Sequence, residues 1–332
     1  MLHGQKKSGF TIVELLIVVV VIAILAAITI VAYNGIRQRA DESSLKSELS
    51  QAVKKIESVK VLSGTETYPS SQTAAGLPDS RIGALSYFYS AIDNSYCVQL
   101  IKGSLTYYSN NDSRNPTEGS CAASNLVGWW KLNGDSIDSS GKGNNGIPAG
   151  ITQAVGENGQ SNGAYGFTFD ANSSVTIPSS TSINTDLQTF SIWVNPIDWL
   201  SPTASVLMSK RDADQKGFFM AYIVASNTLA FDCGSTSQRW ATGYIPPVAT
   251  WTHIAFTCSL DGTVIFYLNG VKQGTRTGVN RSTISTPAQL RIGRDSNDSL
   301  RYNLNGSLDD ARLYNRVLND SEIQLLYNSH AK

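Results

Sequence analysis

The first part of the chain has a hydrophobic pattern that predicts one long helix with two different halves. Residues 10–33 are almost all apolar and contain no helix breaker, so this run exceeds the roughly 18 apolar residues that a membrane-spanning helix needs. Within residues 35–62 apolar side chains recur at steps of three and four, opposite a face of Lys, Glu, Ser and Gln. The pattern predicts a rod of roughly 80 Å over residues 10–62. Gly35 is its weakest point, because a helical glycine costs about 1 kcal/mol relative to alanine.

The pattern after this helix predicts a small sheet. Ser63 and Gly64 end the helix, and three strand-like runs follow before the composition changes near Asn125. We expect these strands to cover the apolar face of the helix, so that residues 34–124 form an amphipathic helix with a small β head. The predicted strands are 85–91, 96–102 and 105–109, and Gly103-Ser104 makes the turn between the last two.

Residues 125–332 have the pattern of an all-β sandwich, in which short strands alternate with polar turns. All six tryptophans lie in this part. Asp261-Gly262 and Asn269-Gly270 are dipeptides that two-residue type I′ turns prefer, and Asn319 with Glu322 forms a capping box for a short terminal helix. The predicted strands are 127–132, 164–170, 174–177, 189–195, 205–210, 218–225, 228–233, 251–260, 263–268 and 289–294. The fold class is therefore α+β, with a long N-terminal helix, a small β head and an all-β sandwich.

One acid interrupts the apolar part of the helix. Glu14 lies inside residues 10–33, and a carboxylate there costs on the order of 2.5 to 3.5 kcal/mol at the centre of a bilayer, so it needs a partner. No basic residue lies within a turn or two of it. A cut between Gly9 and Phe10 creates an amino group at a matching depth, and a neighbouring copy of the chain can bring that group to Glu14. The pairing that we expect is between subunits.

Residues 6–15 contain two lysines, a glycine, a phenylalanine and Glu14 in that order. This stretch resembles the leader and processing site of type IV pilins and pseudopilins. The resemblance implies that residues 1–9 are a prepilin leader, which prepilin peptidase removes after Gly9 before Phe10 is N-methylated. It implies that residues 10–33 form a transmembrane and filament-core helix, and that Glu14 docks on the next subunit during assembly. A secretory signal peptide and a plain signal anchor are alternatives, but neither gives Glu14 a role.

All four cysteines lie beyond the apolar run, and export makes disulfides an expected state for them. A bridge from Cys97 to Cys121 closes a loop of about 25 residues and adds on the order of 3 kcal/mol in the chain-entropy model. Two buried thiols are the alternative, although many pilins tie down their C-terminal loop with such a bridge. Cys233 and Cys258 both face the sandwich core by period-two counting, and alternation does not separate a bridge from two thiols; export favours the bridge.

The second domain resembles the laminin G-like, concanavalin A-like jelly rolls. The stretches that carry the resemblance are 127–132, 138–146, 165–170, 251–255, 267–270 and 304–316. Members of this family often hold a structural Ca²⁺, which takes six to eight oxygen ligands, and the resemblance implies Asp138, Asn144 and Asp309 as the calcium ligands. The alternative is that these side chains only form turns through their own backbone.

Catalysis is not predicted, and neither is binding to nucleic acid. Beyond residue 126 the only glutamates are Glu157, in a loop, and Glu322, in the terminal helix, so the paired carboxylates of a jelly-roll glycosidase are missing. His253 is interpreted as a half-buried strand residue. Lys and Arg total 26, as do Asp and Glu, so no overall charge favours nucleic acid.

The predicted function is a type IV pilin-like subunit, minor or at the tip, that displays a lectin-like adhesion domain. Its leader is cytoplasmic, its single span lies in the membrane, and its C-terminal part is outside the cytoplasm and on the surface filament after assembly. Its expected partners are prepilin peptidase, other pilin subunits, the membrane, and a surface glycan or protein. The alternatives are a pseudopilin of a type II secretion system and a membrane-anchored lectin-like receptor that does not polymerise.

Overall fold

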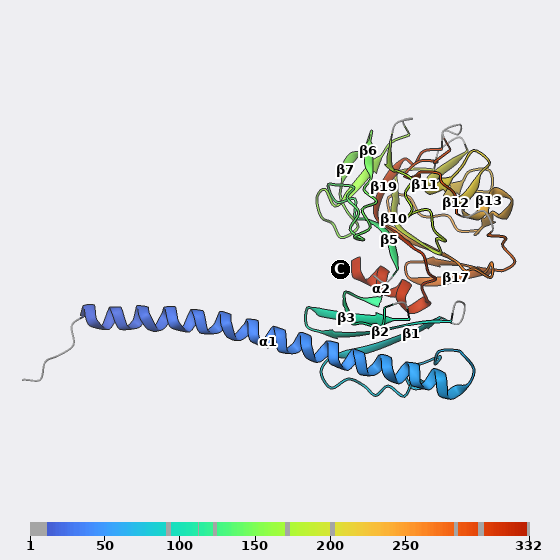
Figure 1. The fold of residues 1–332 in the computed structure, drawn as a ribbon. Helices are drawn as coiled ribbons and strands as arrows, with labels where there is room; N and C mark the ends of the chain where they lie inside the picture. The colour runs from blue at the N-terminus through green and yellow to red at the C-terminus, as the bar shows by residue number, and fades with distance from the viewer. Residues whose placement is uncertain are drawn as a thin grey trace, which may run out of the picture.

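The computed structural model describes residues 12–90, 94–111, 113–121, 125–169, 173–199, 203–281, 285–297 and 302–330. Gly9 and Phe10 lie outside the described residues, as does the side chain of Glu14. The described part consists of a long helix, a small sheet and a two-sheet sandwich, with a short second helix near the end of the chain (Figure 1).

Helix α1 (Ile12–Ser63) is the predicted rod, and its front half projects away from the rest of the molecule (Figure 1). The stretch Leu15–Ser63 includes a window of mean hydropathy 3.4, which is long and apolar enough to cross a membrane, and none of that window is buried. α1 continues without a break through Gly35, which was predicted to be its weakest point. Each added residue contributes a backbone hydrogen bond once the helix has formed, which offsets the cost of one glycine. Gly64 follows the last helical residue with a φ of 65°.

The head is a four-stranded antiparallel sheet in the order β1-β2-β3-β4 that packs on the rear half of α1. The sequence predicted the first three strands and missed β4, which has only two residues. Leu45, Leu49 and Ile56 of α1 are fully buried against Val98 and Leu100 of β2. The strands are β1 (Ala84–Ser90), β2 (Ser95–Lys102), β3 (Leu105–Asn110) and β4 (Thr117–Glu118).

Leu49→Ala is expected to destabilise the head by about 2 to 5 kcal/mol, because it removes a fully buried side chain and leaves a cavity. Leu62→Ala is the matched control on the same helix, since Leu62 is 84% exposed, and should stay within about 0.5 kcal/mol. Chemical denaturation of the full chain in detergent, with hydrogen exchange of the β2 amides as the local readout, measures both. Equal losses for the two variants would mean that the head does not pack on this face of α1.

The second domain is a sandwich of two antiparallel sheets, as predicted. One has eight strands in the order β17-β16-β15-β10-β19-β8-β7, with β5 also paired to β19, and the other has seven in the order β14-β13-β12-β11-β18-β9-β6. The eight-stranded sheet consists of β5 (Leu126–Trp130), β7 (Thr152–Ala154), β8 (Ala164–Phe167), β10 (Thr189–Pro196), β15 (Thr252–Cys258), β16 (Val264–Leu268), β17 (Val271–Arg276) and β19 (Gly306–Tyr314). The seven-stranded sheet consists of β6 (Ile147–Ala149), β9 (Ser174–Ile177), β11 (Ala204–Arg211), β12 (Lys216–Ile223), β13 (Thr228–Ser235), β14 (Trp240–Ala241) and β18 (Leu290–Ile292), and a short 3-10 turn, η2 (Thr236–Gln238), follows β13.

Strand β19 is the main element that the strand prediction missed. It pairs with β10, β8 and β5, so it occupies the middle of the eight-stranded sheet. Its sequence contains Asp309, Asp310 and Arg312, and charged residues are depleted in strands. Asp310 and Arg312 form an ion pair with N–O distances of 2.9 Å, which makes burial of these charges tolerable.

The two predicted hairpins are present, but their turns differ. Asn269 and Gly270 both have positive φ, at 48° and 76°, as a type I′ turn requires between β16 and β17. Between β15 and β16 the strands end earlier, at Cys258, and resume at Val264. Only Gly262 of the Asp261-Gly262 pair has a positive φ there. This connection is therefore a longer loop rather than the expected two-residue turn.

The two sheets enclose one large hydrophobic core and are joined covalently. Within this core the Phe231 ring stacks on Phe256 and packs at a tilt against Phe190, with ring centroids 4.6 and 5.0 Å apart. The disulfide between Cys233 and Cys258 lies in the same core and links β13 of one sheet to β15 of the other.

Helix α2 (Asp320–His330) lies between the sandwich and the head (Figure 1). Its capping box forms as predicted: Asn319 Oδ1 accepts from the Glu322 N–H at 3.0 Å, and Glu322 Oε2 accepts from the Asn319 N–H at 3.0 Å. Ile323 and Leu326 are buried against Tyr267 and Tyr314 on the outer face of the eight-stranded sheet. α1 covers one face of the head sheet, and α2 with the sandwich lies on the opposite side (Figure 1).

Candidate processing and binding sites

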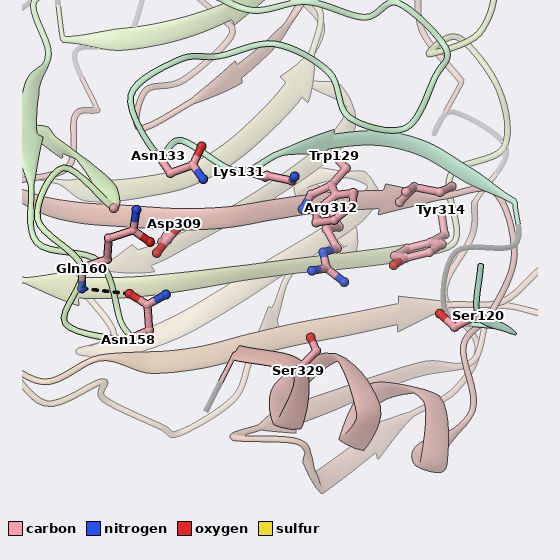
Figure 2. A pocket seen from close by; sticks show the side chains of 12 residues that line it. Ser120, Trp129, Lys131, Asn133, Asn158, Gln160, Asp309, Arg312, Tyr314 and Ser329 are labelled. Atoms are coloured by element: carbon pink, nitrogen blue, oxygen red, sulfur yellow. Dashed lines mark hydrogen bonds between the residues drawn. The ribbon is translucent and has the colours of Figure 1, made fainter. Parts of the chain in front are cut away.

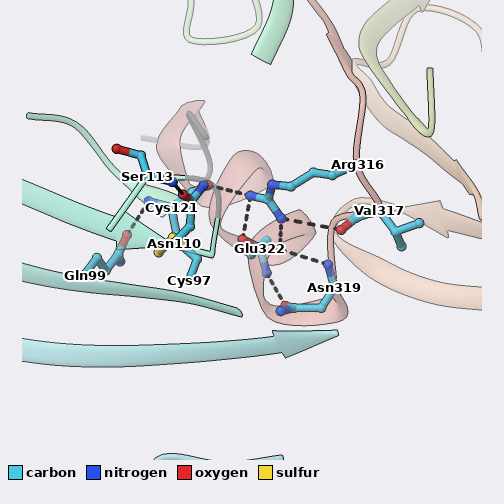
Figure 3. Close-up of a disulfide and its surroundings, with 9 residues drawn as sticks. All are labelled: Cys97, Gln99, Asn110, Ser113, Cys121, Arg316, Val317, Asn319 and Glu322. Atoms are coloured by element: carbon cyan, nitrogen blue, oxygen red, sulfur yellow. Dashed lines mark hydrogen bonds and ion pairs between the residues drawn. A yellow bond between two sulfur atoms is a disulfide. The ribbon is translucent and has the colours of Figure 1, made fainter. Parts of the chain in front are cut away.

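The head and the sandwich meet at a buried ion pair beside a disulfide (Figure 3). Cys97 of β2 is bonded to Cys121, and the carbonyl oxygen of Cys121 accepts a hydrogen bond from Arg316 Nη2. The Arg316 guanidinium also donates to both Glu322 oxygens at 2.8 Å. Arg316 is 8% exposed, and Glu322 only 1%. Since Arg316 contacts both domains, the disulfide-bonded end of the head is tied to the base of α2.

A groove of about 440 Å³ lies over β5 and β19, between Ser120 of the head and Ser329 of α2 (Figure 2). A volume of this size falls in the range of small-ligand sites. Trp129 and Tyr314 supply its aromatic lining. Its polar lining consists of Lys131, Asn133, Asn158, Gln160, Asp309 and Arg312.

Strand pairing positions the centre of this groove. Trp129 on β5 is the cross-strand partner of Arg312 on β19, and the guanidinium carbon lies 4.4 Å from the centre of the indole ring. The ammonium group of Lys131 lies 4.7 Å from the same ring. The indole N–H donates to Asp310, the carboxylate that also pairs with Arg312. Trp129 is therefore held by contacts with two cations and one carboxylate.

Sequence reasoning did not find this groove. Trp129 lies on β5 and Lys131 directly follows the end of that strand, while Arg312 and Tyr314 both lie on β19, so the members of each pair are two residues apart and line the same groove. This two-residue spacing could have indicated that each pair shares one face of the sheet. The groove could be predicted only once β19 was recognised as a strand next to β5.

Asp309 lies in the groove on the side of Gln160 (Figure 2). It is 6% exposed, and its Oδ2 accepts a 3.4 Å hydrogen bond from the Glu157 backbone N–H. Burial, followed by the neighbouring Asp310 carboxylate, raises the pKa of Asp309 from 3.8 to about 8.

Asp309→Asn is expected to stabilise the chain at pH 8 and to change little at pH 4. Between these values the unfolded chain ionises residue 309 while the folded chain keeps its proton, so the free energy of unfolding of the natural chain falls as pH rises. One pKa unit corresponds to about 1.4 kcal/mol, so the gain at pH 8 is up to about 5 kcal/mol. Thermal unfolding at both pH values measures it, with Asp135→Asn, an exposed carboxyl, as the control. A gain of the same size at pH 4 would contradict this explanation.

The three residues predicted to bind calcium have other roles in the structure. The Asp138 carboxylate accepts from the backbone N–H groups of Trp129, Ser140 and Asn144 at 2.8 to 3.0 Å. The side-chain oxygen of Asn144 accepts from two serine hydroxyls, and its amide nitrogen donates to the Val127 carbonyl. In the part of the chain that the structure describes, no group of three His, Cys, Asp or Glu side chains could hold a metal ion. Hydrogen bonds within the chain explain why Asp138 and Asn144 are buried in this loop, and calcium binding stays a prediction.

The residues considered for catalysis, His253, Glu157 and Glu322, make hydrogen bonds or ion pairs with other residues of the chain. His253 is fully buried, and its Nε2 lies 2.9 Å from the Ser191 hydroxyl. It is therefore deeper than the half-buried position expected from the sequence. Glu322 caps α2 and pairs with Arg316, and the backbone of Glu157 contacts Asp309.

Two family models match the chain. The prokaryotic N-terminal methylation motif matches residues 4–30, which include Gly9, Phe10 and Glu14. The concanavalin A-like lectin/glucanases superfamily matches residues 169–324. These matches lie in the two parts of the chain whose residues carried the family resemblances.

Known proteins resemble the two parts separately. The type IV wide pilus major component PilA4 of Thermus thermophilus is 38% identical over 97 residues, which are 28% of this chain and 72% of that protein. Adhesion G-protein coupled receptor V1 of Danio rerio is 25% identical over 154 residues, which are 43% of this chain and 2% of that protein. Domain 4 of AbnA, an extracellular arabinanase from Geobacillus stearothermophilus solved with arabinotriose, has a TM-score of 0.48 and 21% identity, over 61% of this chain and 98% of that domain.

The N-terminal motif, the apolar helix and the relationship to the pilus component agree with one another. They support a membrane-anchored pilus subunit, and the second domain adds a lectin-like jelly roll to it. This chain belongs to the type IV pilin family and carries a concanavalin A-like sandwich after its pilin head.

Proposed function

We propose that this chain is a minor or tip subunit of a type IV filament that presents its sandwich for adhesion. Prepilin peptidase cuts between Gly9 and Phe10 and methylates Phe10, and Glu14 then pairs with the amino group of a neighbouring subunit. The relationship to a pilus component over 97 residues supports this assignment, together with the methylation motif over residues 4–30.

The observation that carries the adhesive role is the placement of the sandwich relative to α1. α1 packs on one face of the head sheet, while the other side of the head meets α2 and the sandwich at the Arg316 junction. In a filament whose core is made of α1 helices, this arrangement directs the sandwich away from the filament axis. A lectin-like domain in that position reaches a surface glycan or protein on another cell or material.

The size of the sandwich favours a minor or tip position. Residues 125–332 add a whole second domain to a pilin head, and a subunit stacked along the shaft has to fit such a domain beside every neighbour. A tip subunit avoids this crowding, because it has no subunit above it.

Immunogold labelling of sheared filaments tests this proposal, with an antibody raised against the sandwich. We expect sparse label, at filament ends or at isolated positions, and strong loss of surface attachment in cells that lack the chain. Label that stays with the cell envelope, with no filament-bound gold, would point instead to a secretion pseudopilus or to a receptor that does not polymerise.

A further inference from the structure

We propose that the groove over β5 and β19 binds an acidic saccharide, whose carboxylate is held by Lys131 and whose hydroxyl groups are held by the amide side chains beside Asp309. This inference rests on the proposed adhesive function and specifies the class of ligand and the site. Nothing in the relationships to known proteins assigns a role to this groove, which lies on the α2 side of the eight-stranded sheet.

The positive charge available in the groove comes from Lys131. Arg312 is already paired with Asp310 at 2.9 Å, so its charge is balanced within the protein. Lys131 makes no ion pair among the described residues, and its ammonium group is positioned 4.7 Å from the centre of the Trp129 ring. The contact with the ring positions a long, flexible side chain, and the ammonium group keeps its positive charge. An anionic group entering the groove therefore meets a cation that is already in place.

The other end of the groove carries uncharged hydrogen-bonding groups. Asn133, Asn158 and Gln160 are exposed, and their side chains lie around Asp309 in Figure 2. Asn158 Oδ1 accepts from the Gln160 backbone N–H at 2.9 Å, which orients the Asn158 amide nitrogen for an external acceptor. Amides and a buried carboxyl can both donate to and accept from sugar hydroxyls.

The composition of the lining favours a saccharide over a peptide. Peptide grooves usually offer apolar pockets for anchoring side chains or a free strand edge. Here most of the lining residues have amide, hydroxyl or charged side chains, and the half-buried Trp129 ring adds an aromatic face, while Leu126 and Tyr314 are buried. The groove also touches Ser120 of the head and Ser329 of α2, so an occupant contacts both domains.

Titration calorimetry on the full chain in detergent tests the proposal, with a galacturonic acid trisaccharide and sialyllactose as acidic probes. A neutral galactose trisaccharide and a triglutamate peptide are the comparison probes. We expect at least one acidic saccharide to bind, at least about tenfold more tightly than the neutral one, since a hydrogen bond to a charged group contributes more than a neutral one. Its affinity should fall as salt is added.

Lys131→Gln should weaken this binding at least about tenfold, and Lys131→Arg should keep it within about threefold. Gln160→Ala removes an exposed amide without touching the core and should weaken acidic and neutral saccharides alike, by about threefold. Lys272→Gln, an exposed lysine on β17, is the matched control and should change nothing. Thermal unfolding of each variant confirms that it is folded.

The proposal is overturned if neither acidic saccharide binds, if Lys131→Gln binds as tightly as the natural chain, or if triglutamate binds as tightly as the saccharides. These results concern the groove alone. Filaments that still contain the Lys131→Gln chain would leave the assignment as a pilus subunit intact, whereas a chain that binds the saccharide but never enters filaments would overturn that assignment and keep the groove.

Discussion

Glu14→Val is expected to leave the chain in the membrane fraction and to reduce its amount in sheared filaments by more than about tenfold. The substitution makes the helix more apolar, so insertion into the membrane improves. In the proposed filament it also leaves the amino group of a neighbouring subunit without its carboxylate. An unpaired charge in an apolar interior costs about 3 to 5 kcal/mol, and about 1.4 kcal/mol already changes an equilibrium tenfold.

Glu48→Val provides the matched control for this experiment. It removes an acid from the same helix α1, but within the amphipathic half that packs on the head. Immunoblots of filament and membrane fractions, with equal total expression, compare the two variants. If Glu14→Val enters filaments as well as Glu48→Val does, the pairing between subunits is not what holds this chain in a polymer.

Arg316→Met should be the most damaging single change at the junction of the two domains. It leaves the Glu322 carboxylate buried without its bidentate partner and removes the donor to the Cys121 carbonyl oxygen. Removing one member of a buried pair typically costs about 3 to 5 kcal/mol. We expect faster hydrogen exchange in α2 and in residues 113–121, while β12 and β13 of the sandwich stay protected.

Arg114→Met is the comparison, because it also breaks an Arg–Glu pair. That pair joins Arg114 to Glu57 at 3.0 Å, but the Arg114 side chain is 61% exposed. Exposed pairs contribute at most about 1 kcal/mol. The Arg316 contacts do not hold the sandwich on the head if hydrogen exchange in α2 is unchanged in Arg316→Met. The same conclusion follows if this exchange is equally fast in Arg114→Met.

Local signals were sufficient to predict much of the fold. The change from an all-apolar to an amphipathic helix located the point where the head packs, and the capping box at Asn319 and Glu322 formed as the sequence indicated. Period-two counting placed Cys233 and Cys258 in the sandwich core, where they lie. These features depend on residues close together in sequence, so a single stretch contains the information.

The features that were missed depend on partners far apart in the chain. β19 carries charges that argue against a strand until Asp310 is seen to pair with Arg312 and to receive the Trp129 indole N–H. The groove brings β5 and β19 together from positions 129 and 312, and the Arg316 junction joins residue 121 to residue 316. Sequence reasoning also assigned Asp138 and Asn144 to calcium, whereas the structure shows what their oxygens accept from the chain itself.

The mass of the mature N-terminus tests the central claim most directly. The chain is purified from cell envelopes and from sheared filaments, and its N-terminal peptide is analysed by mass spectrometry. A peptide that begins at Phe10 with one added methyl group is the predicted result. A peptide that still begins at Met1 would contradict the assignment as a processed filament subunit. So would a cut within residues 23–27, whose small side chains are where a secretory signal peptide would be cleaved.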